Sequence, residues 1–329
     1  MTGAAGFIGR HVAAALVDVG ADVRSFDLRP RAQDGIEPVV GDILDRDALV
    51  NALDGCDAVF HLAAVYSYSR SDAARMRAVN VDGTRSVLDA VARTRTRPRV
   101  VYTSSCATCG PVRRRAATED DGPPPWELVV PYKRTKLDAE RLALEAAAEG
   151  HDVVVVNPTT PVGAGDERPT PTGKMVRDVV TGRAPAYLAR SVLNIVAVED
   201  VARGHLRAFE RGRAGQRYLL GGENMPMRDV FGAIARAAGR RPPRLALPWA
   251  PVYAAARAAD LLMRPLRREP QLLVLDEVRL ARLPMAFDDA KARRELGHES
   301  RPGVAALTEA VAAVRASAAT TASNGRGGH

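Results

Sequence analysis

Cysteine is scarce in this sequence of 329 residues, and the few cysteines form no familiar pattern. Cys56, Cys106 and Cys109 are the only ones, which does not suggest a disulfide framework. Cys106 and Cys109 have the spacing of a metal or redox pair, but no second Cys or His pair stands near to complete a zinc site. We therefore expect no metal, and two small apolar side chains that fill a loop.

Long uncharged segments are also lacking. No stretch approaches the ~20 residues of a membrane span, and no signal peptide opens the chain. An apolar fraction of 46% and a charged fraction of 26% are ordinary for a globular protein with a substantial core. These features predict a cytoplasmic protein.

Lysine is the third scarcity. The net charge of +8 comes almost wholly from arginine, because the chain has only four lysines. The arginines are scattered and no aromatic residues are interleaved with them, which argues against nucleic-acid binding. A cofactor or substrate that carries phosphate would explain some of this positive field.

Three glycines at the start of the chain form the first candidate site. Gly3, Gly6 and Gly9 have G-x-x-G-x-x-G spacing and lead into an amphipathic helical pattern. In a dinucleotide site the first makes a tight turn, the second lets the backbone approach a pyrophosphate, and the third packs the helix on the sheet. The helix N-terminus presents free N–H groups to the phosphates.

Two acidic residues further along fit the same cofactor. Asp27 ends a short strand where a dinucleotide fold places the carboxylate that binds the adenosine ribose, which favours NAD. Arg29 and Arg31 could still accept a 2′-phosphate, so NADP is not excluded, and a plain turn aspartate is the alternative for Asp27. Asp42 could accept a hydrogen bond from the adenine amino group, with Ile43 packing on the ring.

Strand and helix patterns alternate along the first half of the chain. This order predicts an α/β fold with a Rossmann-type, doubly wound parallel sheet. We expect a dinucleotide-binding domain over 1–160, to which 193–220 return. A smaller, mostly helical substrate-binding part is expected over 161–192 and 221–316, followed by a disordered tail over 317–329.

Tyr132, Lys136 and Ser105 form the candidate catalytic group. Tyr132 and Lys136 are four residues apart at a helix start, so their side chains share one face. A nearby ammonium and an oxidised nicotinamide would lower the pKa of tyrosine from its reference value of about 10. Ser105 ends the preceding strand and can hydrogen-bond the substrate oxygen whose proton Tyr132 takes or gives. The group predicts general acid–base chemistry at Tyr132.

Together these motifs resemble the extended short-chain dehydrogenases/reductases of the NAD-dependent epimerase/dehydratase type. The resembling segments are 2–9, 41–43, 61–64, 80–84, 103–105, 132–136, 157–158 and 198–202. The resemblance implies that Ser105, Tyr132 and Lys136 are the catalytic triad. It implies cofactor contacts at Gly3, Gly6, Phe7, Ile8, Gly9, Asp27, Asp42, Ile43, Leu62, Ala63, Ala64, Tyr132, Lys136 and Pro158.

The resemblance leaves two reactions open. Segments 132–136, 157–163, 169–173 and 220–224 are most similar to the hopanoid-associated sugar epimerases, themselves similar to dihydroflavonol-reductase-like proteins. An epimerase would pass a carbinol hydride to NAD⁺ and return it to the other face of the ketone, and Asp27 favours this interpretation. A reductase or dehydrogenase, including the hydroxysteroid-dehydrogenase-like kind, would deliver hydride from NAD(P)H to a carbonyl. A 4,6-dehydratase is disfavoured because Cys106 and Ala107 stand where that class has an acidic pair.

A non-catalytic dinucleotide sensor is the alternative from another class, and the Tyr132 and Lys136 pair weighs against it. The expected ligand is a small molecule, a sugar (such as a nucleotide sugar) or carbonyl compound that could be lipid-linked. An apolar segment at 249–263 could line a lipid-sized pocket or touch a membrane, with a plain core helix as the simpler interpretation. Helices at 72–93 and 132–148 could form a homodimer.

The strand before the glycine turn is central in this fold, yet only Met1 and Thr2 precede Gly3. A central strand reduced to two residues would expose the edges of its neighbours. The resemblance places valine where Met1 stands, so we expect a truncated first strand and a misassigned start.

Overall fold

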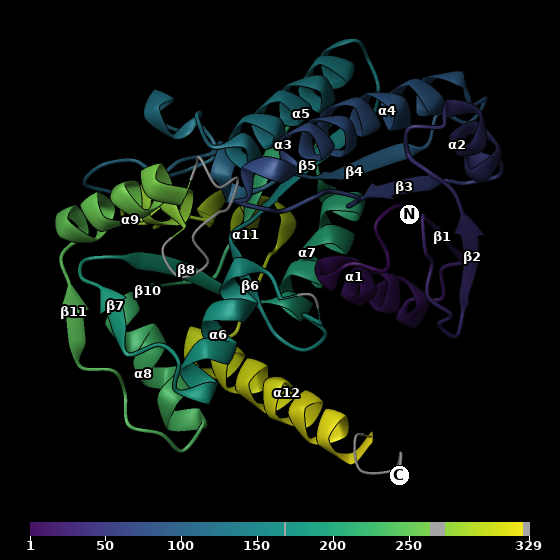
Figure 1. Cartoon of the computed structure of the whole chain (residues 1–329). Helices are drawn as coiled ribbons and strands as arrows, with labels where there is room; N and C mark the ends of the chain where they lie inside the picture. The colour runs from purple at the N-terminus through teal and green to yellow at the C-terminus, as the bar shows by residue number, and fades with distance from the viewer. Residues whose placement is uncertain (168, 264–273, 325–329) are drawn as a thin grey trace.

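The computed structural model describes residues 1–167, 169–263 and 274–324, and a parallel sheet lies at its centre (Figure 1). Thr2 forms parallel bridges to both Phe26 and His61, so the pairing order is β2, β1, Thr2, β3, β4, β5 and β9. Thr2 therefore occupies the predicted place of the first central strand. The strands are β1 (Val23–Asp27), β2 (Ile36–Val40), β3 (Ala58–His61), β4 (Arg99–Thr103), β5 (Val153–Pro158) and β9 (Arg217–Leu220).

Helices cover both faces of this sheet. In β5, Val153 and Val155 belong to one apolar cluster with residues of α2, α4 and α5, whereas Val154 and Val156 belong to another with residues of α1, α7 and α11. All four valines are buried, as is usual for a parallel strand between two helical layers. The helices are α1 (Phe7–Asp18), α2 (Arg46–Leu53), α4 (Gly83–Arg93), α5 (Pro131–Ala148), α7 (Val198–Arg211) and α11 (Ala290–Leu296). The predicted doubly wound α/β fold is confirmed.

The helix expected over 72–93 is interrupted. It consists of the 3₁₀ turn η1 (Arg70–Asp72), α3 (Ala73–Arg77), the π-helical turn η2 (Ala78–Asp82) and α4. The π turn contains Asn80, which is buried and whose amide donates to Val65 O (3.0 Å) and accepts from Val65 N (2.7 Å). The interruption thus fixes the loop that leaves β3.

The rest of the chain builds a second core of small sheets and helices. Val176 of α6, Ile195 of β8, Phe231 of α8 and Leu307 of α12 meet in this core. The strands are β6 (Thr160–Val162), β7 (Ala186–Leu188), β8 (Val192–Ala197), β10 (Glu223–Pro226) and β11 (Leu245–Leu247). The helices are α6 (Pro171–Thr181), α8 (Met227–Ala237), α9 (Trp249–Met263), α10 (Leu275–Leu280) and α12 (Gly303–Asn324).

Two segments differ from expectation. Of the segment 193–220, β9 pairs with β5, but β8 pairs with β6 and β10, because β9 already occupies the free edge of β5. The tail predicted to be disordered over 317–329 is helical as far as Asn324, and 325–329 lie outside the described residues. Several alanines in this segment favour helix. Within the described ranges, no helix is both long and apolar enough to cross a bilayer.

Candidate active site

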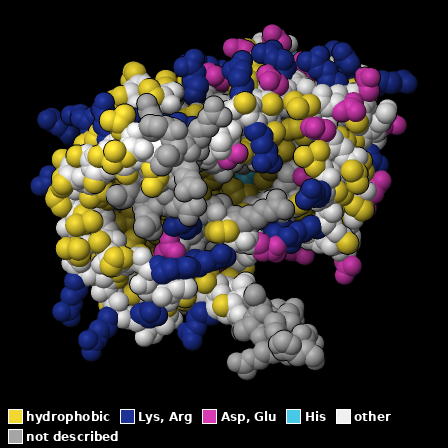
Figure 2. All heavy atoms as spheres, in the orientation of Figure 1, with side chains coloured by type: hydrophobic (Ala, Val, Ile, Leu, Met, Phe, Trp, Pro, Cys, Tyr) yellow, Lys and Arg dark blue, Asp and Glu magenta, His cyan; other side chains and the backbone are white. Residues whose placement is uncertain are grey.

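A cavity of about 610 Å³ lies between the carboxyl ends of the parallel strands and the second core. Open α/β sheets bind ligands at this edge. Figure 2 shows the hollowed face, with hydrophobic side chains gathered over α9 and β11. The predicted site residues that line the cavity are Gly3, Gly6, Phe7, Ile8, Gly9, Leu62, Ala64, Ser105, Tyr132, Lys136 and Pro158.

At Gly3 and Gly9, neighbouring backbone atoms lie too close for a side chain, as the glycine spacing predicts. Gly3 has φ +75°, and a Cβ on it would lie 2.6 Å from the backbone nitrogen of Ala63. A Cβ on Gly9 would lie 1.9 Å from the carbonyl oxygen of Gly3. Gly6 caps α1 without a side chain, so the first N–H groups of this helix stay open to a phosphate.

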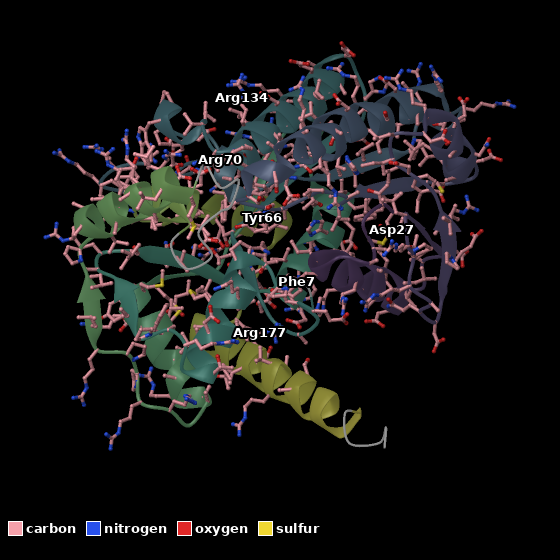
Figure 3. The ribbon with its side chains drawn as sticks, viewed as in Figure 1. Phe7, Asp27, Tyr66, Arg70, Arg134 and Arg177 are labelled. Atoms are coloured by element: carbon pink, nitrogen blue, oxygen red, sulfur yellow. The ribbon has the colours of Figure 1, made fainter. Side chains whose placement is uncertain are left out.

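Asp27 lies at the end of β1 beside this turn, as Figure 3 shows together with Phe7 at the start of α1. Its carboxylate accepts hydrogen bonds from the N–H groups of Gly3 (3.1 Å) and Ala5 (3.3 Å) and from the Ser25 hydroxyl (3.0 Å). Burial raises the pKa of Asp27, and these hydrogen bonds act against that rise. The carboxylate is thus held at the turn itself, where a ribose would lie.

Four predicted cofactor residues are not part of the cavity wall, namely Asp27, Asp42, Ile43 and Ala63. The exposed Asp42 accepts from the N–H of Leu44 (3.0 Å). Ile43 is buried, and its Cδ1 would lie 2.4 Å from a Cβ on Gly83. Ile43 therefore packs in the core and has little surface left for an adenine ring, while contact of Asp42 and Ala63 with a cofactor stays a prediction.

An acidic residue of the second part binds two arginines near the glycine turn. Glu167 accepts from Nη1 of Arg10 on α1 (2.9 Å) and from Nη1 of Arg31 after β1 (2.9 Å). Arg31 is one of the two arginines that the sequence offers for a 2′-phosphate. Its guanidinium is already engaged by a carboxylate in this structure.

The three catalytic candidates meet at one side of the cavity. Lys136 is buried and donates from Nζ to the carbonyl oxygen of Thr103 (2.7 Å), with Nζ 5.2 Å from the centre of the Tyr102 ring. Burial lowers the pKa of Lys136 to about 8. Burial raises the pKa of Tyr132 to about 12, and interaction with the Ser105 hydroxyl acts in the opposite direction. Ser105 thus lies close enough to Tyr132 to share a substrate oxygen with it.

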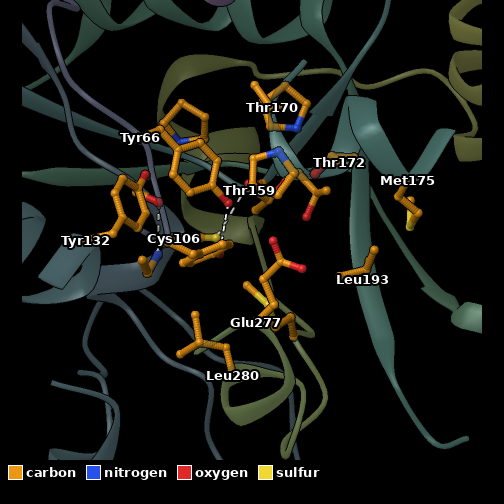
Figure 4. Close-up of a pocket in the computed structure, with 18 of the residues that line it drawn as sticks. Tyr66, Cys106, Tyr132, Thr159, Thr170, Thr172, Met175, Leu193, Glu277 and Leu280 are labelled. Carbon is orange, nitrogen blue, oxygen red and sulfur yellow. Dashed lines mark hydrogen bonds between the residues drawn. The ribbon is translucent and has the colours of Figure 1, made fainter. Parts of the chain in front are cut away.

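Two further tyrosines, not identified from the sequence, surround Tyr132. The Tyr66 and Tyr132 rings are 4.3 Å apart at their centres, and the Tyr66 and Tyr68 hydroxyls are 2.9 Å apart. Burial raises the pKa of Tyr68. Both lie just after β3, so the pattern Tyr-x-Tyr beyond a sheet end is the signal that could have found them. Figure 4 shows the Tyr66 ring beside the Tyr132 ring, and the Tyr68 ring contacts the Tyr132 ring edge-on at 6.4 Å between centres.

A buried polar network holds α5, the helix of Tyr132 and Lys136, against the sheet. Glu140, one turn beyond Lys136, accepts from Asn157 Nδ2 (2.6 Å), Thr108 Oγ1 (2.7 Å) and Arg217 Nη1 (2.8 Å). These partners come from β5, the 3₁₀ turn η3 (Cys106–Thr108) and β9. Three elements are therefore fixed to the helix that carries Tyr132 and Lys136.

A second buried ion pair lies beside Tyr132. Lys133, which lines the cavity, binds Glu127 and donates to the carbonyl oxygen of Gly110 (2.6 Å). Both side chains are almost wholly buried, and burial raises the pKa of Glu127. Glu127 lies in the 3₁₀ turn η4 (Pro125–Glu127), in a proline-rich segment without periodicity, so no sequence pattern predicts this pair.

The donor set fits a dinucleotide. The turn leaves no room for Cβ atoms, and α1 presents unpaired N–H groups, as a pyrophosphate requires.

Cys106 and Cys109 are buried, and Cys106 Sγ contacts Thr159 O at 3.6 Å. Among the described residues, no cluster of three or more His, Cys, Asp or Glu side chains could hold a metal ion.

Known proteins are similar to this chain in sequence and in fold. A model of the NAD-dependent epimerase/dehydratase family matches residues 1–221. A Synechocystis protein provisionally named dihydroflavonol 4-reductase is 36% identical over 94% of this chain and 92% of its own. Sterol demethylase protein B of Methylococcus capsulatus is 34% identical over 95% of this chain and 96% of its own.

A solved structure of a sugar epimerase has a fold similar to that of this chain. A nucleoside-diphosphate-sugar epimerase from Pseudomonas aeruginosa is 28% identical over 96% of each chain, with a TM-score of 0.76. The family match and the identity of the relatives cover the glycine turn and the Tyr132 region alike. The chain therefore belongs to the NAD-dependent epimerase/dehydratase family of extended short-chain dehydrogenases/reductases, whose cofactor is a nicotinamide dinucleotide.

Proposed function

We propose that this chain interconverts a ketone and a secondary alcohol on a largely apolar substrate, as a dehydrogenase or ketoreductase. The observation that carries the proposal is the lining of the cavity opposite Tyr132. Polar residues such as Thr170, Thr172 and Lys174 contribute to that lining, but much of it consists of apolar and aromatic side chains, namely Met175, Tyr187, Leu188, Leu193, Phe231, Leu280, Leu283 and Met285. A nucleotide sugar would need cations for its diphosphate, whereas this wall suits a hydrocarbon skeleton. The names of the two curated relatives, a reductase and a sterol enzyme, support the same substrate class.

The residues around Tyr132 divide the chemistry among them. When bound, the nicotinamide supplies or accepts the hydride at the carbinol carbon. In reduction, Tyr132 donates its phenolic proton to the ketone oxygen, and Ser105 donates a hydrogen bond to that oxygen. Lys136, held under the ring of Tyr102, stabilises the tyrosinate that results. In the overall reaction, the ketone, NAD(P)H and one proton give the alcohol and NAD(P)⁺.

Sugar epimerisation, which the sequence favours, is the second candidate. It is supported by Asp27, which lies at the glycine turn and would repel a 2′-phosphate, and by the engagement of Arg31 with Glu167. Both features favour NAD over NADP, and an epimerase regenerates NAD⁺ in each cycle.

The homodimer, the peripheral membrane contact, the hopanoid link and the cytoplasmic location stay predictions, as do the residue limits of the two domains.

The two candidates are separated by the fate of the cofactor. One sample of the purified protein is denatured, and any nucleotide that it releases is identified. A second, native sample receives apolar cyclic ketones together with NADH or NADPH that carries deuterium at the transferred position. We expect stoichiometric oxidation of NADH, with deuterium at the carbinol carbon of the product. Tightly retained NAD⁺, no net oxidation, and interconversion of UDP-sugar epimers would instead establish the epimerase.

The pH dependence of the two directions follows from the pKa of Tyr132. Alcohol oxidation needs tyrosinate, whereas ketone reduction needs the protonated phenol. Because burial raises the pKa of Tyr132 to about 12 in the free protein, kcat/KM for oxidation should rise by about tenfold per pH unit through the neutral range. The kcat/KM for reduction should stay level there. Initial rates in both directions test this, with circular dichroism as the folding control, and an oxidation rate that falls with pH would contradict it.

A further inference from the structure

The cavity wall opposite Tyr132 contains a carboxylate in apolar surroundings. Glu277 lies in the first turn of α10 and lines the cavity together with Leu280, Leu283 and Met285. Figure 4 shows its carboxylate pointing into the space between Leu193 and Thr159, across from the Tyr66 and Tyr132 rings. Glu277 is exposed in the free protein, so water reaches its carboxylate, but a ligand that fills the cavity would replace that water.

Glu277 differs from the other charged residues of the lining in its partners. Lys133 binds Glu127, Lys136 binds the carbonyl of Thr103, and Lys174 binds Asp178 at 2.6 Å. Within the described ranges, no hydrogen bond or ion pair engages the Glu277 carboxylate. The protein atoms around Glu277 partly desolvate its carboxylate and so raise the pKa of Glu277, and the positive charge of Lys174 opposes that rise.

That the described residues offer the Glu277 carboxylate no hydrogen bond or ion pair has a consequence for any ligand. In the free protein, water in the cavity can hydrate the carboxylate. An apolar substrate that fills the cavity would expel this water and leave a charge without a hydrogen bond, which is costly. A substrate that brings its own hydrogen-bond donor to this place avoids the cost.

We propose that Glu277 selects and orients the substrate by accepting a hydrogen bond from a hydroxyl group that lies at the far end of an apolar skeleton from the reacting carbonyl. The proposal rests on the function proposed above. Tyr132 and Glu277 line the same cavity, so one bound molecule can reach both. Glu277 is a specificity residue, and the hydride and proton transfers at Tyr132 do not pass through it.

The test uses three skeletons of increasing length, namely cyclohexanone, decalone and androstanone. Each is offered as the parent ketone, with a hydroxyl at the ring position farthest from the carbonyl, and with the methyl ether of that hydroxyl. For the skeleton that spans the cavity, we expect the hydroxyl compound to exceed both others in kcat/KM by about 10-fold. Glu277→Leu should remove this preference through KM, with kcat little changed, and should favour the parent ketone.

The variants keep the two proposals separable. Glu277→Gln retains an acceptor oxygen without charge, so it should keep about a third of the preference, and it serves as the readout if Glu277→Leu does not fold. Glu210→Gln, on the exposed surface of α7, is the matched control and should change nothing. An unchanged hydroxyl preference in both Glu277 variants, or no such preference in the wild type, would overturn the role of Glu277. Failure of the wild type to reduce any ketone would overturn the function on which it rests.

Discussion

Tyr132→Phe is expected to lower kcat by about 1,000-fold, because it removes the phenolic proton that we propose is transferred to the ketone oxygen. The ring keeps its position against Tyr66, whose centre is 4.3 Å away, so binding should change little. Ser105 and the bound cofactor remain and account for residual turnover. Single-turnover measurement of hydride transfer, with nucleotide affinity measured in parallel by calorimetry, gives the two quantities.

Tyr66→Phe is the matched control for this experiment. It removes a hydroxyl from the neighbouring ring, breaking the 2.9 Å contact with Tyr68, without touching the acid–base group. We expect less than about a tenfold loss. If Tyr66→Phe and Tyr132→Phe had equal effects, or if Tyr132→Phe kept full turnover, the assignment of Tyr132 as acid and base would be wrong.

Lys133→Met is expected to destabilise the fold by about 3–5 kcal/mol, because it leaves the buried Glu127 carboxylate without its countercharge. The burial that raises the pKa of Glu127 then lacks the opposing effect of Lys133. The double variant Glu127→Leu with Lys133→Met removes both charges and should recover most of the loss. Urea unfolding monitored by circular dichroism measures the free energy of unfolding in each case.

An exposed ion pair on the same helix shows what burial adds. Arg134 pairs with Asp138 at 3.2 Å, with the Arg134 side chain 59% exposed. Arg134→Met should leave stability almost unchanged, because solvent screens such pairs. A double variant no more stable than Lys133→Met would show that the loss comes from packing and not from the unpaired charge.

The residues that could be predicted are those whose chemistry lies in local spacing. Gly3, Gly6 and Gly9 are recognisable because one turn and one helix start need all three, and Tyr132 and Lys136 because one helix face presents both. Ser105 follows from the rule that the carboxyl ends of parallel strands meet at one edge. The doubly wound fold follows from the alternation of strand and helix.

What could not be predicted depends on contacts between distant segments. Glu167 meets Arg31 across 136 positions of the chain, and neither residue carries a local pattern. Glu277 becomes noticeable only because α10 turns it towards the cavity that Tyr132 faces. For Ile43, the motif predicts contact with the adenine ring, which stays a prediction, but it does not show that the lack of a Cβ at Gly83 makes room for the Ile43 side chain.

The valines of β5 leave the relative alignment of the strands undetermined by hydrophobicity. Because both faces of β5 are apolar, sliding the strand by one residue would exchange valine for valine in each core, at little cost in buried area. Polar bonds at the strand ends remove this ambiguity: Asn157 reaches Glu140, and Lys136 reaches the Thr103 carbonyl on neighbouring β4. Lys136, which we propose assists the proton transfer, therefore also helps to hold the helix that carries it against β4, while Asn157 opposes a shift of β5.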